Sequence, residues 1–245
     1  MRTLAIGDIH GCYHALTTLE ASAGFQPDDH IITLGDYIHR GPDSRSAVEW
    51  LIDRQGKGNL TALRANHECV FQAAIGSELG RETWLGFGGT QMLASCKVQS
   101  IDLIPTEHRA FLQSGLKDVY ENDTLFCVHA NTREASALKD QTEHMLFWKK
   151  FVDVTPHHRG KTMVCGHTPQ RSGYPKNIVH AICIDTAAGR KGWLTCLDLD
   201  SRCCWHANEA GKTRSFSLDF VDEAARRNQQ RQSLKDSENA RLSLI

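Results

Sequence analysis

The stretch TLAIGDIHG, residues 3–11, sets the pattern for the first part of the chain. It is a short apolar run, typical of a buried strand, and it ends in a glycine and an aspartate. Residues 30–36, HIITLGD, repeat this arrangement, and residues 59–68, NLTALRANHE, form a third apolar run that ends in polar residues. These three runs predict three strands whose carboxyl ends carry polar side chains.

Helical patterns separate the predicted strands. Residues 13–23 are rich in good helix formers, and residues 44–55 form an amphipathic pattern for which Ser44 is the expected N-cap. Alternation of strand and helix predicts an α/β fold with parallel crossovers. Residues 69–115 are mostly helical in pattern, and we interpret them as a helical insertion or cap within one domain that spans 1–221.

The rest of the chain is rich in predicted strands and ends in a polar segment. Residues 222–245 lack aromatic residues and are expected to form a solvated tail. The later apolar runs each match a short strand, and they lie at 123–130, 161–168, 178–186, 192–200 and 201–207.

Composition excludes several classes of protein. Hydrophobic residues make up 40% of the chain and the formal net charge is −1, so nothing in the overall charge indicates a nucleic acid or an anionic membrane as partner. No apolar run reaches the roughly 18 residues that cross a bilayer, and we expect no secretory signal. The nine cysteines include no CxxC pair, which argues against a thiolate zinc site and favours a reducing cytoplasm.

Polar residues of metal-binding types follow the predicted strands. In an open α/β sheet, ligands bind at the carboxyl ends of strands, so these side chains are expected to meet at one edge. Each residue alone has an ordinary explanation as a turn or cap residue, but the complete set after successive strands does not. The set consists of Asp8, His10, Asp36, Asn66, His67, His129 and His167.

The ligand types indicate which metals these residues suit. Carboxylate, imidazole and amide groups without thiolate suit Mn, Fe or Zn. They are too many for one catalytic zinc, and they fit two ions about 3.5–4 Å apart that share a carboxylate. Arg40, four residues after Asp36, offers a planar guanidinium for phosphoryl oxygens.

The order of these motifs resembles that of the phosphoprotein phosphatase family of metallophosphoesterases. That family includes serine/threonine phosphatases, the bacteriophage lambda phosphatase and bacterial diadenosine tetraphosphate hydrolases. The resemblance implies two packed mixed β-sheets flanked by helices, with the active site at one edge. The motifs that carry it are GDIHG (7–11), GDYIHRG (35–41), NHE (66–68), VHA (128–130) and GHT (166–168).

The resemblance also implies a role for each residue of the set. Asp8 and His10 would bind the first metal, Asp36 would bridge, and His67 would be the general acid. Glu68 would support the ligand shell. Two divalent ions are expected, manganese first, with iron or zinc as alternatives. The remaining second-metal ligands would be Asn66, His129 and His167. The substrate-binding candidates are Arg40, Asn66 and Lys150, with Arg133 and Arg171 as competitors for the last of these.

Two residues depart from the family pattern. His39 stands where the family has an aspartate that accepts a hydrogen bond from the catalytic histidine. Losing such a carboxylate can cost about 10⁴ in turnover in a serine protease. Ala65 stands where the family has glycine, and alanine would be strained there if the backbone needed positive φ.

Three functions remain open at this stage. The first is a phosphatase that acts on phosphoproteins or small phosphate esters, with activity reduced by His39. The second is a dinucleoside polyphosphate hydrolase that uses the same metals. The third is a catalytically impaired phosphate-binding or regulatory protein that has kept the ligands.

Overall fold

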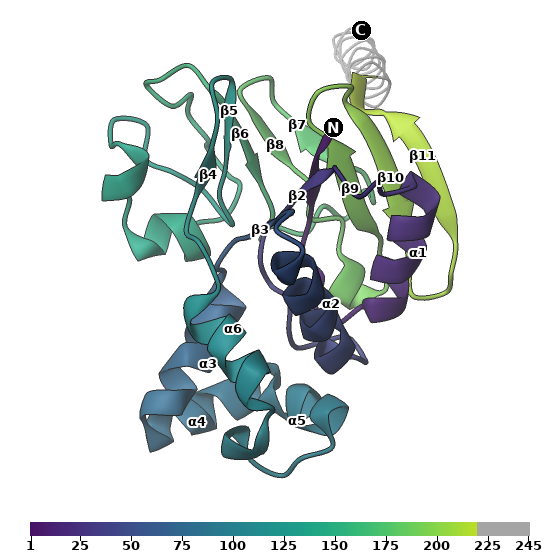
Figure 1. Cartoon of the computed structure of the whole chain (residues 1–245). Coiled ribbons are helices and arrows are strands. Elements are labelled where there is room, and N and C mark those ends of the chain that lie inside the picture. Colours follow the sequence, from purple (N-terminus) through teal and green to yellow (C-terminus); the bar gives the residue numbers. More distant parts are fainter. Residues whose placement is uncertain (220–245) are drawn as a thin grey trace, which may run out of the picture.

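The computed structural model describes residues 1–219, so the tail predicted over 222–245 lies outside the described residues. It contains two β-sheets that lie against each other, with helices on their outer faces and below them (Figure 1). One sheet has six strands in the order β11-β10-β9-β1-β2-β3, and the other has five in the order β4-β5-β6-β8-β7. The predicted fold class, two mixed sheets flanked by helices, is confirmed.

The six-stranded sheet contains strands from the beginning and from the end of the described chain. Its first three strands pair in parallel, as the alternating pattern predicts, and its last three pair antiparallel. The polar residues that follow the first three strands therefore emerge at one edge. The strands are β1 (Thr3–Ile6), β2 (His30–Thr33), β3 (Leu60–Ala62), β9 (Leu194–Asp198), β10 (Cys203–Ala207) and β11 (Thr213–Ser217).

Two helices cross over between these strands, α1 (Tyr13–Ala23) and α2 (Ser44–Gly56). The N-cap of α2 is Asp43 rather than the predicted Ser44, because the Asp43 carboxylate accepts the Ser46 backbone N–H. The Ser44 hydroxyl is instead buried and accepts the backbone N–H of His39 at 3.0 Å. Ser44 therefore fixes the turn after β2.

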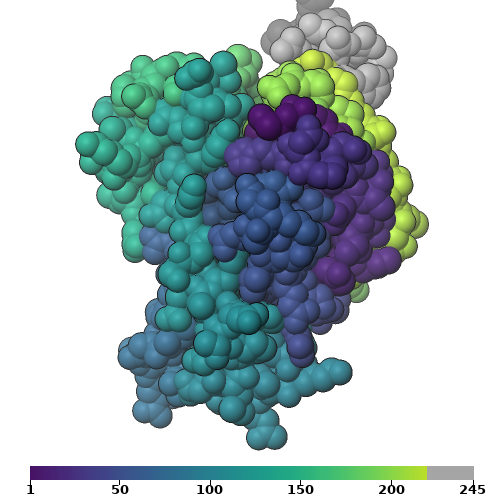
Figure 2. All heavy atoms as spheres, viewed as in Figure 1, coloured from purple at the N-terminus to yellow at the C-terminus, as the bar shows by residue number. Residues whose placement is uncertain are grey.

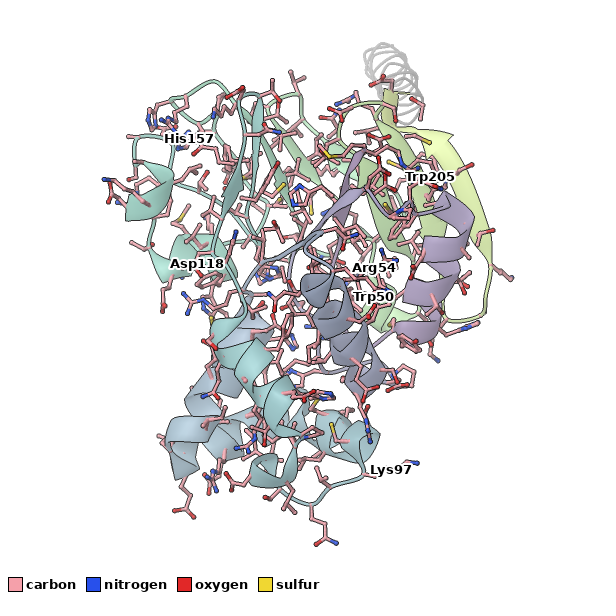
Figure 3. All side chains as sticks on the ribbon, in the orientation of Figure 1. Trp50, Arg54, Lys97, Asp118, His157 and Trp205 are labelled. Carbon is pink, nitrogen blue, oxygen red and sulfur yellow. The ribbon has the colours of Figure 1, made fainter. Side chains whose placement is uncertain are left out.

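Side chains of α2 reach towards α1. The Trp50 indole donates to the Glu20 carboxylate at 2.7 Å, and Arg54 pairs with the same carboxylate (Figure 3). The two crossover helices are therefore joined by polar contacts as well as by apolar packing.

The five-stranded sheet packs its apolar face on the first sheet. Its three central strands, β5, β6 and β8, run parallel, and short strands flank them. Ile32 and Leu197 from the first sheet share a buried cluster with Val164 and Ile182 from the second. The strands are β4 (Tyr120–Glu121), β5 (Leu125–Cys127), β6 (Thr162–Cys165), β7 (Lys176–Asn177) and β8 (Ala181–Cys183).

Between β3 and β4 the chain forms a group of helices that projects below the sheets (Figures 1 and 2). Residues 66–114, which we call the helical segment, hold α3 (Asn66–Gly76), α4 (Glu78–Trp84), α5 (Thr90–Cys96) and α6 (Thr106–Ser114). An ion pair of 2.9 Å joins Arg64, just before the segment, to Asp118, just after it (Figure 3).

Shorter helical turns complete the described chain. No helix within residues 1–219 combines the length and the apolar character needed to cross a bilayer. None of the nine cysteines, all of which lie within the described residues, forms a disulfide. The turns are Leu85–Gly89, Ile101–Leu103, Leu138–Asp140, His144–Trp148 and Ala188–Arg190.

Candidate metal centre

The predicted ligands meet where strands of both sheets end. The ligands form two groups, in each of which the ligand atoms lie within 4.8 Å of one another, and Asp36 belongs to both groups. This is the arrangement that a carboxylate shared by two ions requires. The first group consists of His10, Asp36 and His67, and the second of Asp36, His129 and His167.

Acceptor atoms of the second group and of Asn66 face one another without a donor between them. His129 Nε2 lies 3.0 Å from Asn66 Oδ1 and 3.2 Å from His167 Nδ1. His129 Nε2 also lies 3.6 Å from Asp36 Oδ1. Converging acceptor atoms repel one another unless a cation lies among them, so these side chains fit a metal ion.

Backbone carbonyls orient the imidazoles of both groups. His10 Nδ1 and His129 Nδ1 donate to the carbonyls of Ile38 and Leu34, at 3.3 and 2.8 Å, and His167 Nε2 donates to that of Trp148 at 3.1 Å. Each imidazole therefore directs its unprotonated nitrogen at the centre, as metal ligands do. Burial lowers the pKa of all three histidines, which keeps them neutral.

Arg40 lies among the residues of the first group. Its guanidinium donates to His10 Nε2 at 2.9 Å and approaches His67 Nε2 at 3.2 Å, while His10 Nε2 is 3.3 Å from Asp36 Oδ2. A positive group thus fits between these side chains.

Asp8 lies beside the two groups rather than in either of them. Its carboxylate accepts the backbone N–H of His167 at 3.1 and 3.0 Å. Burial and the nearby carboxylates of Asp185 and Asp36 raise the pKa of Asp8 well above its usual value. The first-metal role of Asp8 remains a prediction.

Asp185 is a candidate residue that the sequence reasoning missed. It is buried, its Oδ1 accepts the Ala187 N–H, and its Oδ2 has no hydrogen-bond partner among the described residues. Burial raises the pKa of Asp185 to about 6. The sequence carries a signal for this residue, a carboxylate directly after an apolar run. Asp185 follows the run around β8, as Asp8 and Asp36 follow the runs of β1 and β2.

The turn after β2 is held by Glu68, from the NHE motif that follows β3. Its carboxylate accepts the backbone N–H groups of Asp36 and Tyr37 at 3.0 and 2.9 Å.

The backbone of the site is left-handed at several non-glycine residues, a conformation that side chains disfavour. These residues are His10 (φ 49°), Asp36 (φ 52°), His39 (φ 74°), Arg40 (φ 67°) and His167 (φ 63°).

His39 replaces the family carboxylate as a buried neighbour of His67. The Nδ1 atoms of His39 and His67 are 2.7 Å apart, and the indole N–H of Trp84 donates to His39 Nε2 at 2.7 Å. Burial and the charge of Arg40 lower the pKa of His39 to about 3, so its side chain is neutral.

The other departure from the family pattern, Ala65 in place of glycine, is harmless. Ala65 has an extended backbone, with φ −137° and ψ 175°, so no positive φ is required there.

Positively charged side chains surround the predicted second metal. A cavity of about 320 Å³ is lined by Asp36, Asn66 and His167 together with Arg40, Lys150, Arg171 and Arg190. Both Lys150 and Arg171, two of the candidates for the further phosphate contact, thus line this cavity. Arg133 does not, and only its backbone has a hydrogen bond with Gln141.

Comparisons with known proteins agree with this geometry. A symmetrical bis(5'-nucleosyl)-tetraphosphatase from Erwinia tasmaniensis is 35% identical over 82 residues, which are 33% of this chain and 29% of that protein. The match therefore spans less than a third of this relative's length.

Two solved structures share the fold. A putative diadenosine tetraphosphatase has a TM-score of 0.60 and 18% identity, over 88% of this chain and 92% of the other. A serine/threonine phosphatase from Saccharomyces cerevisiae has a TM-score of 0.58 and 16% identity, over 89% and 80%.

A comparison with protein families confirms the predicted resemblance. Residues 1–188 match the calcineurin-like phosphoesterase family, whose members act on phosphate esters and normally use a dinuclear metal centre. The chain belongs to the calcineurin-like phosphoesterase family.

Proposed function

We propose that this protein is a metal-dependent hydrolase of dinucleoside polyphosphates. The observation that carries the proposal is the group of four cationic side chains, Arg40, Lys150, Arg171 and Arg190, around one cavity of about 320 Å³. None of the four forms an ion pair with a carboxylate within residues 1–219. No carboxylate in direct contact therefore neutralises these four side chains, which supports binding of an anion in the cavity.

The amount of positive charge favours several phosphates over one. Two divalent ions and one arginine already exceed the charge of a single phosphate dianion. Lys150, Arg171 and Arg190 add charge that a chain of phosphates would use, because each phosphate presents oxygens for charge-assisted hydrogen bonds.

Neighbouring cavities leave room for the nucleosides. A cavity of about 460 Å³ shares Arg171 and Arg190 with the cavity at the metal centre, and another of about 510 Å³ shares Arg40 with it. Lys191 lines both neighbouring cavities and extends the positive surface. A substrate with a phosphate chain and two bulky ends suits this arrangement.

The proposed chemistry divides between the metal centre and the side chains around it. When bound, two divalent ions, manganese in our proposal, would supply an acidic water and neutralise phosphoryl oxygens. His10, Asp36, Asn66, His129 and His167 would hold the ions, with Asp8 completing the first site. Arg40 would bind the phosphoryl group under attack, and Lys150 and Arg171 the rest of the phosphate chain. His67 would hold a proton near the leaving oxygen.

The test compares two substrates under one set of conditions. With saturating manganese, kcat/KM for diadenosine tetraphosphate should exceed that for a phosphopeptide and for p-nitrophenyl phosphate. A higher value for the phosphopeptide would favour the phosphoprotein phosphatase function instead. Two bound metal ions without turnover of any substrate would favour the non-catalytic, phosphate-binding alternative.

A pair of variants tests the role of the cations. Arg171→Ala removes a charged hydrogen-bond donor, so KM for the tetraphosphate should rise roughly 10-fold or more, with little change for p-nitrophenyl phosphate. Arg133→Ala is the matched control, because Arg133 is exposed and does not line the cavity. Equal effects of the two substitutions would contradict the assignment.

A further inference from the structure

A buried tryptophan completes the surroundings of the predicted catalytic histidine. Trp84, the last residue of α4, is 1% exposed, and its indole N–H donates to His39 Nε2 at 2.7 Å. His39 Nδ1 lies 2.7 Å from His67 Nδ1, and His67 Nε2 lies 3.2 Å from the Arg40 guanidinium. Three contacts thus link Trp84, His39, His67 and Arg40 in a row.

The groups at both ends of this row can only donate hydrogen bonds. An indole N–H and a guanidinium have no acceptor, whereas each neutral imidazole has one donor and one acceptor. Two donor-only ends and two neutral imidazoles cannot satisfy all three contacts at once. One contact must therefore bring two N–H groups face to face.

Distance and burial identify the contact that is not a hydrogen bond. The two contacts of His39 are both 2.7 Å, and they lie between buried side chains. The contact of Arg40 with His67 is longer, at 3.2 Å, and the Arg40 side chain is exposed and free to turn towards a phosphate. Trp84 therefore sets the direction in which the hydrogen bonds of this row are donated. The contact between Arg40 and His67 is the one that is not a hydrogen bond.

We infer that Trp84 is a positioning residue that fixes the proton of His39 on Nδ1, so that His39 donates to His67 and His67 presents its N–H at Nε2. An aspartate at position 39 would act in the opposite sense. A carboxylate only accepts, so it would place a proton on His67 Nδ1. This chain reverses the hydrogen bond between the two side chains and keeps a donor at His67 Nε2, the atom nearest Arg40, without a negative charge at position 39.

The helical segment is shaped to keep Trp84 in this place. A side chain at Gly89 would put its Cβ 2.5 Å from the Trp84 ring, and one at Gly88 (φ 121°) would put it 2.6 Å from His39 Cβ. The Phe87 ring lies 4.5 Å from the His67 ring and covers it. The Gly89 backbone thus packs directly on the indole and the Gly88 backbone on His39, so both partners of this hydrogen bond are closely packed.

Nitrogen NMR tests the direction of this row without relying on turnover. The probe is the full chain, labelled with ¹⁵N-histidine and loaded with diamagnetic Zn²⁺, and long-range correlations report which ring nitrogen carries hydrogen. We expect the proton on Nδ1 of His39 and on Nε2 of His67. A proton on His67 Nδ1 would overturn the inference, even if no variant could be prepared.

Two substitutions sharpen this test. Trp84→Phe should remove the preference of His39 for the Nδ1 proton, and His39→Asp should move the His67 proton to Nδ1. Trp205→Phe, on β10, is the control for loss of an indole elsewhere. Unchanged histidine signals in Trp84→Phe would show that the indole does not set the direction.

The catalytic use of this proton rests on the proposed function, and kinetics test that part separately. Trp84→Phe should lower kcat roughly 10-fold and leave KM almost unchanged, because the substrate contacts of the cations are intact. An unchanged kcat beside altered signals would overturn the positioning role. If no substrate is turned over, the proposed function fails while the NMR result still decides the direction of the row.

Discussion

Replacing His39 with aspartate should make the protein a faster and less stable enzyme. The carboxylate would stand where His39 Nδ1 now stands, 2.7 Å from His67 Nδ1, and would accept a hydrogen bond from it. A negative charge there stabilises the protonated form of His67, which is the stronger acid catalyst. We therefore expect His39→Asp to raise kcat for phosphoester hydrolysis.

The size of the effect follows from the contacts that are gained and lost. A hydrogen bond to a charged group contributes about 1.5–3 kcal/mol, which corresponds to roughly a 10- to 100-fold rise in kcat. Aspartate is too short to reach Trp84, whose buried N–H would lose its acceptor at a cost of about 1–3 kcal/mol. The melting temperature should fall by about 2–4 °C for each kcal/mol lost.

The assay measures initial rates on p-nitrophenyl phosphate and diadenosine tetraphosphate with saturating manganese, alongside thermal melts. His39→Asn is the matched control, because it has the shape of aspartate without the charge. The asparagine variant should lose stability like the aspartate variant but gain little activity. Equal rates for all three proteins would refute the reasoning, since position 39 would then not influence His67.

Three further predictions concern the metals, the helical segment and the pH dependence. Asp36→Asn should reduce the bound Mn²⁺ from two equivalents, measured by elemental analysis after gel filtration, because Asp36 belongs to both ligand groups. Gly88→Ala should lower the unfolding free energy by about 2 kcal/mol or more in urea melts, because its φ is 121° and the new Cβ would contact His39. Burial and Arg214 lower the pKa of His206 to about 3 in the folded protein, against 6.5 when unfolded, so its contribution to stability is complete above pH 6.5 and is lost as the pH falls towards 3. His206→Gln should make the fall in unfolding free energy over that range shallower.

The central strands could be predicted because the signal for a buried strand lies in their own residues. Apolar runs such as 3–6 and 30–33 are buried on both faces, and this composition is visible in the sequence. The edge strand β11 was missed because TRSFS is short and exposed on alternate residues, and it becomes a strand only by pairing with β10. Strands of this kind depend on tertiary contacts that no local pattern shows.

The site was predictable to the extent that its residues follow strands. Asp36, His129 and His167 were singled out in this way, and the structure brings their ligand atoms together. Trp84 was not singled out, because it stands 45 residues from His39 along the chain and approaches it only through the packing of the helical segment. A tryptophan in a helical pattern gives no local sign of its hydrogen-bond partner.

The left-handed backbone of the site has a consequence for how the protein can change. A non-glycine residue in this conformation costs on the order of 1 kcal/mol or more, and the turn after β2 holds three of them, Asp36, His39 and Arg40. Glycine at any of them would relieve the strain and remove a functional side chain in the same step. Selection for heat resistance alone would therefore accept glycines in this turn and yield robust proteins that no longer act on phosphates, whereas selection for activity must keep the strain.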